Sequence, residues 1–240
     1  MFDQIAKELI AEAEKWDGIQ ARIADMADVL NSPSYKAVGG EHWQDDHAEQ
    51  TIQWLANASS LLILAMHHPK EKPELDWFDQ GNTSGNRWLT KISNVLVDWL
   101  AGNLGIKAQT LPYQVEKGGV YLKDAACLAG LGVIGKNNLL IHPAWGPNVR
   151  LRSVLIQDHL SPSTPLENFN PCYLCTMPCR KACPENALAG GKFHRPSCML
   201  QLESDRENQI ESGGEDAEGS SHLVTAWCRR CELACPVGTN

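Results

Sequence analysis

Two cysteine-rich runs constrain this chain more than any other feature of its sequence. The first, CYLCTMPCRKACP, carries four cysteines between residues 172 and 183 and closes with a proline. The second, CRRCELACP at residues 228–236, repeats the C-x2-C pair and the C-x3-C-P ending. Bacterial [4Fe–4S] proteins use runs of the form C-x2-C-x2-C-x3-C-P, so both runs indicate iron–sulfur ligation.

Zinc and disulfide bonds are the competing explanations for these cysteines. Structural zinc sites use two separated C-x2-C pairs, and disulfides need an oxidising compartment. The N-terminal stretch MFDQIAKELIAEAEKW is acidic and amphipathic, unlike a signal peptide, which favours a reducing cytoplasm. One departure from the bacterial run stands out, because residues 176–178 place three positions between the second and third cysteines where that run has two. Iron–sulfur ligation is the preferred interpretation, and zinc is the alternative.

The number of cysteines predicts two clusters. The chain has nine cysteines, of which seven lie in the two runs, and two cubane clusters need eight. Cys198 is the preferred eighth ligand over Cys127, because it stands where the first ligand of the second run should be. In two-cluster ferredoxins the fourth cysteine of each run binds the other cluster. The predicted ligand sets are therefore Cys172, Cys175, Cys179 and Cys235, and Cys183, Cys198, Cys228 and Cys231.

Composition excludes several classes of function. The 21 lysines and arginines against 29 acidic residues give a formal net charge of −8, and bound clusters would add negative charge. Because binding to a phosphate backbone needs clustered basic residues, a nucleic-acid partner is disfavoured. No apolar run reaches the 18 residues of a membrane span, so no membrane association is expected. The expected location is the cytoplasm.

Hydrophobic periodicity predicts an α+β chain. Residues 1–30 have helical spacing with an interruption near Gly18, and residues 87–105 form a strong amphipathic helix that Gly105 ends. Another helix is expected over residues 47–58. Buried or short strands are expected at residues 60–69, 106–114, 137–143 and 149–157, and a loop at 71–86. We expect an α/β cofactor and substrate domain at residues 1–167 and a cluster domain at 168–240, with a mobile acidic loop at 204–221.

The stretch GLGVIGKNN contains G-x-G-x-x-G at Gly130, Gly132 and Gly135. A dinucleotide-binding fingerprint must follow a strand and open a helix. Here YLKDAACLA before the loop has helical spacing and NNLLIHP after it is strand-like, so NAD binding is disfavoured. Such a loop still allows close backbone approach to a ligand, beside the cation and amides of residues 136–138. The alternative is a plain tight turn.

Several features in this order resemble the epoxyqueuosine reductase family over about residues 55–240. They are the stretch LKDAACLAGLGVIGKNNLLIHPAWGPNVRLRSVL, then CYLCTMPCRKACPENAL, a lone cysteine and CRRCELACPVG. Members of this family reduce an epoxide on a modified tRNA base with cobalamin and two [4Fe–4S] clusters, and reductive dehalogenases are their relatives. The resemblance implies a nitroreductase-like α/β cofactor domain followed by a bacterial-ferredoxin-like module. It also implies a corrinoid between the substrate and the nearer cluster.

Two departures from the family bear on function. Family members continue into a helical domain that helps grip tRNA, whereas this sequence ends five residues after Cys235, so the tRNA-binding domain is expected to be missing. The family's acidic proton donor lies in an Asp-x-x-Pro stretch before the glycine loop. An ungapped count places Glu116 in the acid's position and Gly119 in the proline's, and Asp124 is the alternative acid. The expected substrate is therefore a small molecule or a redox partner protein.

The leading hypothesis is an iron–sulfur, corrinoid-dependent reductase in which Glu116 or Asp124 donates a proton. An electron-transfer protein, a cobalamin-reducing or cobalamin-processing protein and a flavin-dependent reductase with FMN are the alternatives. A side chain at Gly135 is expected to block the corrinoid and spare both clusters. The predicted cofactor-binding residues are Tyr121, Gly130, Gly132, Gly135, Lys136, Asn137 and Asn138.

Overall fold

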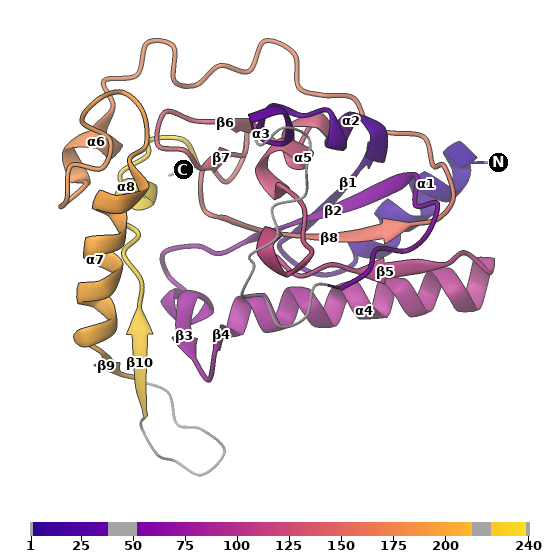
Figure 1. Ribbon diagram of the computed structural model, residues 1–240, viewed down its shortest axis with the longest axis horizontal. Helices are drawn as coiled ribbons and strands as arrows, with labels where there is room; N and C mark the ends of the chain where they lie inside the picture. Colours follow the sequence, from indigo (N-terminus) through magenta and orange to yellow (C-terminus); the bar gives the residue numbers. More distant parts are fainter. Residues whose placement is uncertain (1, 38–51, 213–221, 239–240) are drawn as a thin grey trace. The chain divides into compact units, whose positions relative to one another are not determined.

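The computed structural model describes residues 2–37, 52–212 and 222–238 (Figure 1). They have the expected mixed α+β fold and divide into two compact units. The first unit comprises Met1–His67, Leu89–Ile134 and Val149–Phe169, and the second comprises His68–Trp88, Gly135–Asn148 and Asn170–Asn240. One division, after Phe169, lies close to the expected boundary at 167. The units are nevertheless not consecutive domains, because two earlier segments belong with the cysteine-rich C-terminal part.

A four-stranded antiparallel sheet forms the centre of the first unit, in the order β1-β2-β8-β5. β2 (Ser60–His67) pairs with β1 (Ile19–Asp25) on one side and with β8 (Val149–Ile156) on the other, and β5 (Ala108–Thr110) pairs with β8. β2 is buried from Ser60 to Met66, as a continuous apolar run in a central strand requires. The strands expected at 60–69, 106–114 and 149–157 are confirmed in these shorter forms.

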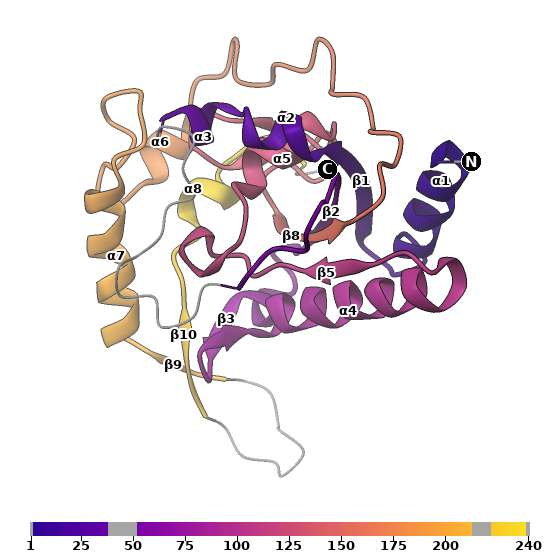
Figure 2. The same ribbon diagram turned by 45° about the vertical axis from the view of Figure 1, so that its right-hand side comes forward.

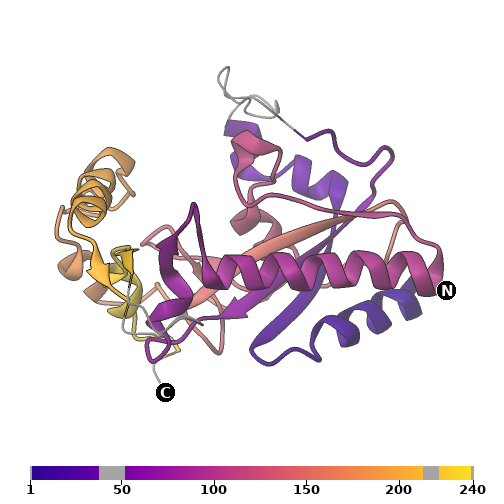
Figure 3. The same ribbon diagram turned by 90° about the horizontal axis from the view of Figure 1, so that it is seen from below.

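Helices cover both faces of this sheet. α1 (Phe2–Ala13) and the part of α4 (Ser84–Leu104) from Leu89 onward bury Leu9, Leu89 and Leu96 against one face. α2 (Met26–Leu30), α3 (Pro33–Ala37) and α5 (Leu122–Leu128) lie on the opposite side (Figures 1 and 2). Figure 3 shows α4 lying along its face of the sheet. The predicted stop is confirmed, since Gly105 follows α4 with a left-handed φ of +66°.

The helical prediction for residues 1–30 is half wrong. α1 is present, but residues 19–25 form β1, and only α2 returns to helix. Ile19, Ala21 and Ile23 are buried at a spacing of two, and the register pairs Ile19 with Met66 of the central strand. The apolar residues of this segment fit both periods, and pairing with β2 decides between them.

The helix expected over residues 47–58 is also wrong where the chain is described. Residues 52–58 are not helical, and residues 47–51 lie outside the described part. The backbone N–H of Leu55 donates to Oε1 of Gln109 over 2.7 Å, and Nε1 of Trp54 donates to the Gly118 carbonyl over 2.7 Å. Contacts with distant residues therefore hold this segment in a non-helical conformation against its local propensity.

A second four-stranded sheet, in the order β4-β3-β10-β9, belongs to the other unit. β3 (Trp77–Asp79) and β4 (Asn82–Thr83) follow the 3₁₀ turn η1 (Pro73–Asp76), so residues 71–86 are more ordered than the expected loop. β10 (Leu223–Ala226) pairs with β3 and with β9 (Ile210–Glu211). Three helices complete the unit: α6 (Pro178–Ala182), α7 (Arg195–Glu207) and α8 (Arg230–Leu233).

Two further sequence-based expectations need correction. Residues 204–212 are the end of α7 and β9 rather than part of a mobile loop, and residues 213–221 lie outside the described chain. Of the strand expected at 137–143, only β7 (Leu140–Ile141) forms, and β6 (Val133–Ile134) precedes the end of the glycine loop. In the described residues, no helix is both long enough and apolar enough to span a bilayer.

Candidate iron–sulfur centres and active site

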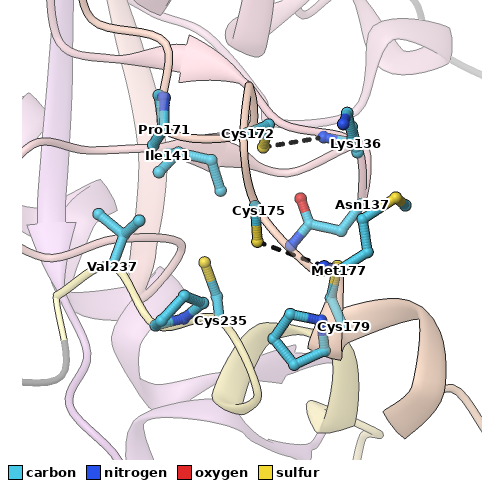
Figure 4. A pocket seen from close by; sticks show the side chains of 12 residues that line it. Lys136, Asn137, Ile141, Pro171, Cys172, Cys175, Met177, Cys179, Cys235 and Val237 are labelled. Carbon is cyan, nitrogen blue, oxygen red and sulfur yellow. Dashed lines mark hydrogen bonds between the residues drawn. The ribbon is translucent and has the colours of Figure 1, made fainter.

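All eight predicted cluster ligands belong to the second unit, and Cys127 belongs to the first. Cys172 and Cys175 lie in the loop before α6, Cys179 lies in α6 and Cys235 follows α8. These four cysteines line one small pocket (Figure 4). In the described chain, no three His, Cys, Asp or Glu side chains converge tightly enough to hold a single metal ion.

The remaining four cysteines form a second neighbourhood. Cys183 follows α6, Cys198 lies on α7, and Cys228 and Cys231 bracket the start of α8. Cys183 and Cys228 both raise the pKa of Cys198 electrostatically, after the larger effect of burial. These are the same two sets of four that the crossed ligand pattern predicts. That each set holds a cluster stays a prediction.

Burial and mutual repulsion oppose ionisation of the Cys179, Cys231 and Cys235 thiols. Burial raises the pKa of Cys231 to about 12, and the neighbouring Cys228 adds to the rise. Burial also raises the pKa of Cys179 and of Cys235, with further contributions from the other cysteines of their group. Because iron binds thiolates, loading these sites must release protons.

The three-residue spacing in the first run has a local explanation. Met177 adopts the left-handed conformation, with φ of +56°, directly before Pro178 opens α6. Its backbone N–H lies 3.4 Å from Sγ of Cys175, within hydrogen-bonding reach of sulfur. The extra residue therefore turns the chain into α6 and supplies a donor to a predicted ligand.

The end of the glycine loop belongs to the first group of cysteines. Lys136 and Asn137 line the same pocket, and the Lys136 backbone N–H lies 3.5 Å from Sγ of Cys172. Asn138 has a left-handed φ of +61° and forms the turn after them. A Cβ at Gly135 would lie 2.7 Å from the Ile141 side chain and 2.8 Å from Oδ1 of Asn137. A side chain at Gly135 would therefore press on two residues of this pocket, and the expectation that it spares both clusters stays a prediction.

The start of the loop is explained by packing within the first unit. Gly130 has a φ of +79°, and a Cβ there would lie only 2.2 Å from the Thr164 carbonyl oxygen. Gly132 is buried. The helix-to-strand context is confirmed, because α5 precedes the loop and β7 follows it. The chain's own close packing thus accounts for Gly130 without any ligand.

The two candidate acids differ in their surroundings. Asp124 is buried in α5, and its Oδ2 accepts a hydrogen bond of 2.8 Å from the Ser34 backbone N–H in the first turn of α3. Glu116 is half-buried in the 3₁₀ turn η2 (Val115–Lys117). Tyr121, before α5, meets the ring of Tyr35 edge-on, with centroids 4.8 Å apart. Asp124 and Tyr121 therefore contribute to packing within the first unit.

Sequence reasoning missed a buried ionic network in the second unit. Nδ1 of His68 lies 2.7 Å from Oδ2 of Asp76, and Arg229 lies 2.6 Å from the same carboxylate. Arg229 also pairs with Glu232 and donates to the His68 carbonyl over 2.9 Å. Arg229 and Glu232 flank Cys231, so this network fixes the second cysteine run onto the segment that begins at His68. The only sequence signal was two charges among cysteines, which is too common to identify a network.

No protein-family model matches the chain. It is 26% identical over 212 residues to an epoxyqueuosine reductase of Lactococcus garvieae, covering 82% of this chain and 57% of that one. It is 32% identical over 187 residues to an epoxyqueuosine reductase of Listeria monocytogenes, covering 74% and 48%. The chain therefore spans about half the length of these curated relatives.

Solved structures of the same kind share the fold. A crystal structure of selenomethionine-labelled epoxyqueuosine reductase matches 99% of this chain and 66% of its own, at 19% identity and a TM-score of 0.65. A reductive dehalogenase, described with a mechanism for B12-dependent dehalogenation, matches 100% of this chain and 33% of its own, at 16% identity and a TM-score of 0.67. The chain thus has an epoxyqueuosine reductase-like fold that is related to the reductive dehalogenases.

Proposed function

We propose that this chain is an iron–sulfur reductase whose eight cysteines hold two [4Fe–4S] clusters and whose second cofactor is a corrinoid. One observation carries the proposal: the eight thiols gather in two groups of four inside one compact unit of a chain with this fold. When bound, the clusters supply low-potential single electrons and the corrinoid supplies a reactive metal centre.

The residues suit [4Fe–4S] clusters by their chemistry. Each group offers four thiols, and the first group also has backbone N–H donors aimed at the sulfurs of Cys172 and Cys175. In the second group the Ala187 N–H lies 3.2 Å from Sγ of Cys183. Donors of this kind stabilise the negative charge of ligated sulfur. The chain's contribution is to hold the eight thiols at fixed positions and to shield them from water.

Support for the corrinoid comes from the likeness to a structure described with B12-dependent chemistry. Tyr121, Gly130 and Gly132 remain its predicted contacts in the first unit. The demand for glycine at position 130 does not add support, because the Thr164 carbonyl already explains it. A flavin is the second choice of cofactor for the same domain.

Glu116 is the preferred proton donor over Asp124. The Asp124 carboxylate is buried and accepts from the N-terminal turn of α3, so using it as an acid would weaken the fold. Glu116 lies in a turn that is half-open to solvent, where a carboxyl group can exchange protons. Its position in the ungapped count with the family's acid supports the same choice.

A small molecule or a redox partner protein is the proposed substrate class. The formal charge of −8 opposes binding to a phosphate backbone, although the relatives named above are epoxyqueuosine reductases. A neutral or cationic acceptor is compatible with such a surface.

Anaerobic reconstitution followed by cofactor binding tests the proposal. We expect about eight iron and eight sulfide per chain, and equilibrium binding of reduced cobalamin that Glu116→Gln leaves unchanged. Cofactor binding without clusters, or stoichiometric zinc without sulfide, would overturn the iron–sulfur part. Full cluster loading with reduction of a partner protein, but no affinity for cobalamin or flavin, would replace the reductase with an electron carrier.

A further inference from the structure

Asn137 carries a buried amide whose nitrogen has no partner in the described chain. Its side chain is 4% exposed, and Nδ2 makes no hydrogen bond with any described residue. A buried donor that is left unsatisfied destabilises the fold, so such a group calls for a ligand. Asn137 lines the pocket that Cys172, Cys175, Cys179 and Cys235 share.

The orientation of this amide follows from its other end. Oδ1 of Asn137 accepts from the Leu139 backbone N–H over 3.3 Å. Rotating the amide by half a turn would bring its NH₂ against that N–H, so Nδ2 is fixed on the opposite side. Figure 4 shows the Asn137 side chain pointing into the space framed by the cysteines.

Two features of the chain keep the amide in place. Any side chain at Gly135 would collide with Oδ1 of Asn137, so glycine there permits this rotamer. The neighbouring Lys136 backbone N–H already points at Sγ of Cys172, so this turn presents donors to the sulfur site. Asn137 is therefore part of the cysteine pocket, and the corrinoid is not needed to explain it.

We propose that Nδ2 of Asn137 donates a hydrogen bond to a sulfur of the cluster held by the first cysteine group and raises the reduction potential of that cluster. The inference rests on the proposed function, since it needs the cluster to be bound. Reduction adds negative charge to the cluster sulfurs, so a donor stabilises the reduced form more than the oxidised form. Asn137 is a positioning and tuning residue and not a ligand.

The test compares cluster potentials in reconstituted wild type and variants. Asn137→Asp keeps the shape and the acceptor for Leu139 but removes the donor, and Asn137→Leu removes both without adding charge. We expect each variant to lower the reduction equilibrium constant of one cluster about tenfold, which is 59 mV for a one-electron couple, and to leave the other unchanged. Asn208→Leu, the same exchange at an exposed residue after α7, should shift neither potential.

A second readout decides the matter if the variants fail to load. Pulsed EPR of the reduced wild-type cluster, with asparagine labelled with ¹⁵N at the side-chain amide, should show a ¹⁵N coupling where unlabelled protein shows a ¹⁴N coupling. Loaded variants with unchanged potentials, or a wild-type cluster without that coupling, would overturn the role of Asn137 and leave the proposed function intact. A wild-type chain that takes up no cluster would overturn both, and the iron and sulfide counts distinguish the two failures.

Discussion

Arg229 joins two buried carboxylates, those of Asp76 and Glu232, and its side chain is only 10% exposed. Removing one partner of a buried ionic network leaves the other charges unpaired, which costs about 3–5 kcal/mol. We therefore expect Arg229→Met to destabilise the second unit by that amount and to lower iron retention. Urea unfolding with iron release as a second signal measures both effects.

Arg230→Met is the matched control, because Arg230 is the next residue and is exposed. Its effect on the free energy of unfolding should stay within about 0.5 kcal/mol, as for ordinary surface positions. Equal destabilisation by the two substitutions would show that the network contributes nothing beyond local helix structure.

Cys127 gives a pH-dependent prediction. Burial raises the pKa of its thiol from the ordinary 9.0 to about 11. Between these values the unfolded chain loses this proton while the folded chain keeps it, so the contribution to stability is complete below pH 9 and lost as pH rises through 11. Wild type should therefore lose more stability than Cys127→Ala from pH 8 to 10.5 in urea unfolding of the reconstituted protein. Parallel pH curves would place Cys127 in contact with solvent.

Sequence reasoning at this scale was strongest for cysteines and weakest for amides and ion pairs. Cluster-binding runs recur at fixed spacings, so the cysteines that the structure gathers in two groups could be named from the sequence, and their role as ligands stays a prediction. Asn137 was expected to contact a corrinoid, whereas its contacts place it in the cysteine pocket. Asp76 and Arg229 are far apart in sequence, and nothing local distinguishes them from surface charges. Pairings of this kind depend on tertiary structure alone.

At the scale of elements, two glycines end helices in the same way but in different surroundings. Gly105 follows α4 and Gly130 closes α5, and both have left-handed φ values. A Cβ at Gly105 would meet nothing within 4 Å, whereas one at Gly130 would meet the Thr164 carbonyl at 2.2 Å. Gly105→Ala should cost about 1–2 kcal/mol of left-handed strain, and Gly130→Ala about 3 kcal/mol or more.

Thermal or urea unfolding of the two alanine variants measures this difference. Strain in φ is common to both, so the excess at Gly130 isolates the clash with the Thr164 carbonyl. Equal costs at the two sites would mean that the backbone around Thr164 moves away freely from a side chain at position 130. The loop would then be an ordinary turn.

Elements with one dominant period could be predicted, and elements whose residues fit two periods could not. The apolar run of β2 and the long stripe of α4 each allow only one interpretation. Residues 19–25 fit a helix as well as a strand, and the backbone of β2 beside them decides for the strand. The non-helical segment at 52–58 depends on Gln109 and Gly118, more than fifty residues away in sequence. Such long-range contacts leave no periodic signal.

For the whole molecule, the domain boundary expected near residue 167 lies close to one division between the two units. The sequence did not show that two earlier segments of the chain also belong to the second unit. The second unit takes its β3 strand from His68–Trp88 and part of its cysteine pocket from Gly135–Asn148. Gly238 packs against this second segment so closely that a Cβ would lie 2.2 Å from the Trp145 carbonyl carbon. The cysteine runs alone therefore lack a strand partner for β10, the pocket residues Lys136, Asn137 and Ile141, and the Asp76 partner of Arg229.

This interleaving predicts that residues 168–240 do not form an independent ferredoxin. Expressed alone and reconstituted anaerobically, the fragment should retain far less iron than the full chain. Its β10 has no β3 to pair with, and the Arg229 and Glu232 charges lose Asp76 and His68. Iron and sulfide counts, with unfolding curves beside those of the full chain, measure the difference. Full-length Cys127→Ala serves as the control that should keep all of its iron, while full-length Cys198→Ala should fall to one cluster's worth. A fragment that holds eight iron with the potentials of the full chain would show that the two earlier segments only cover a module that is already complete.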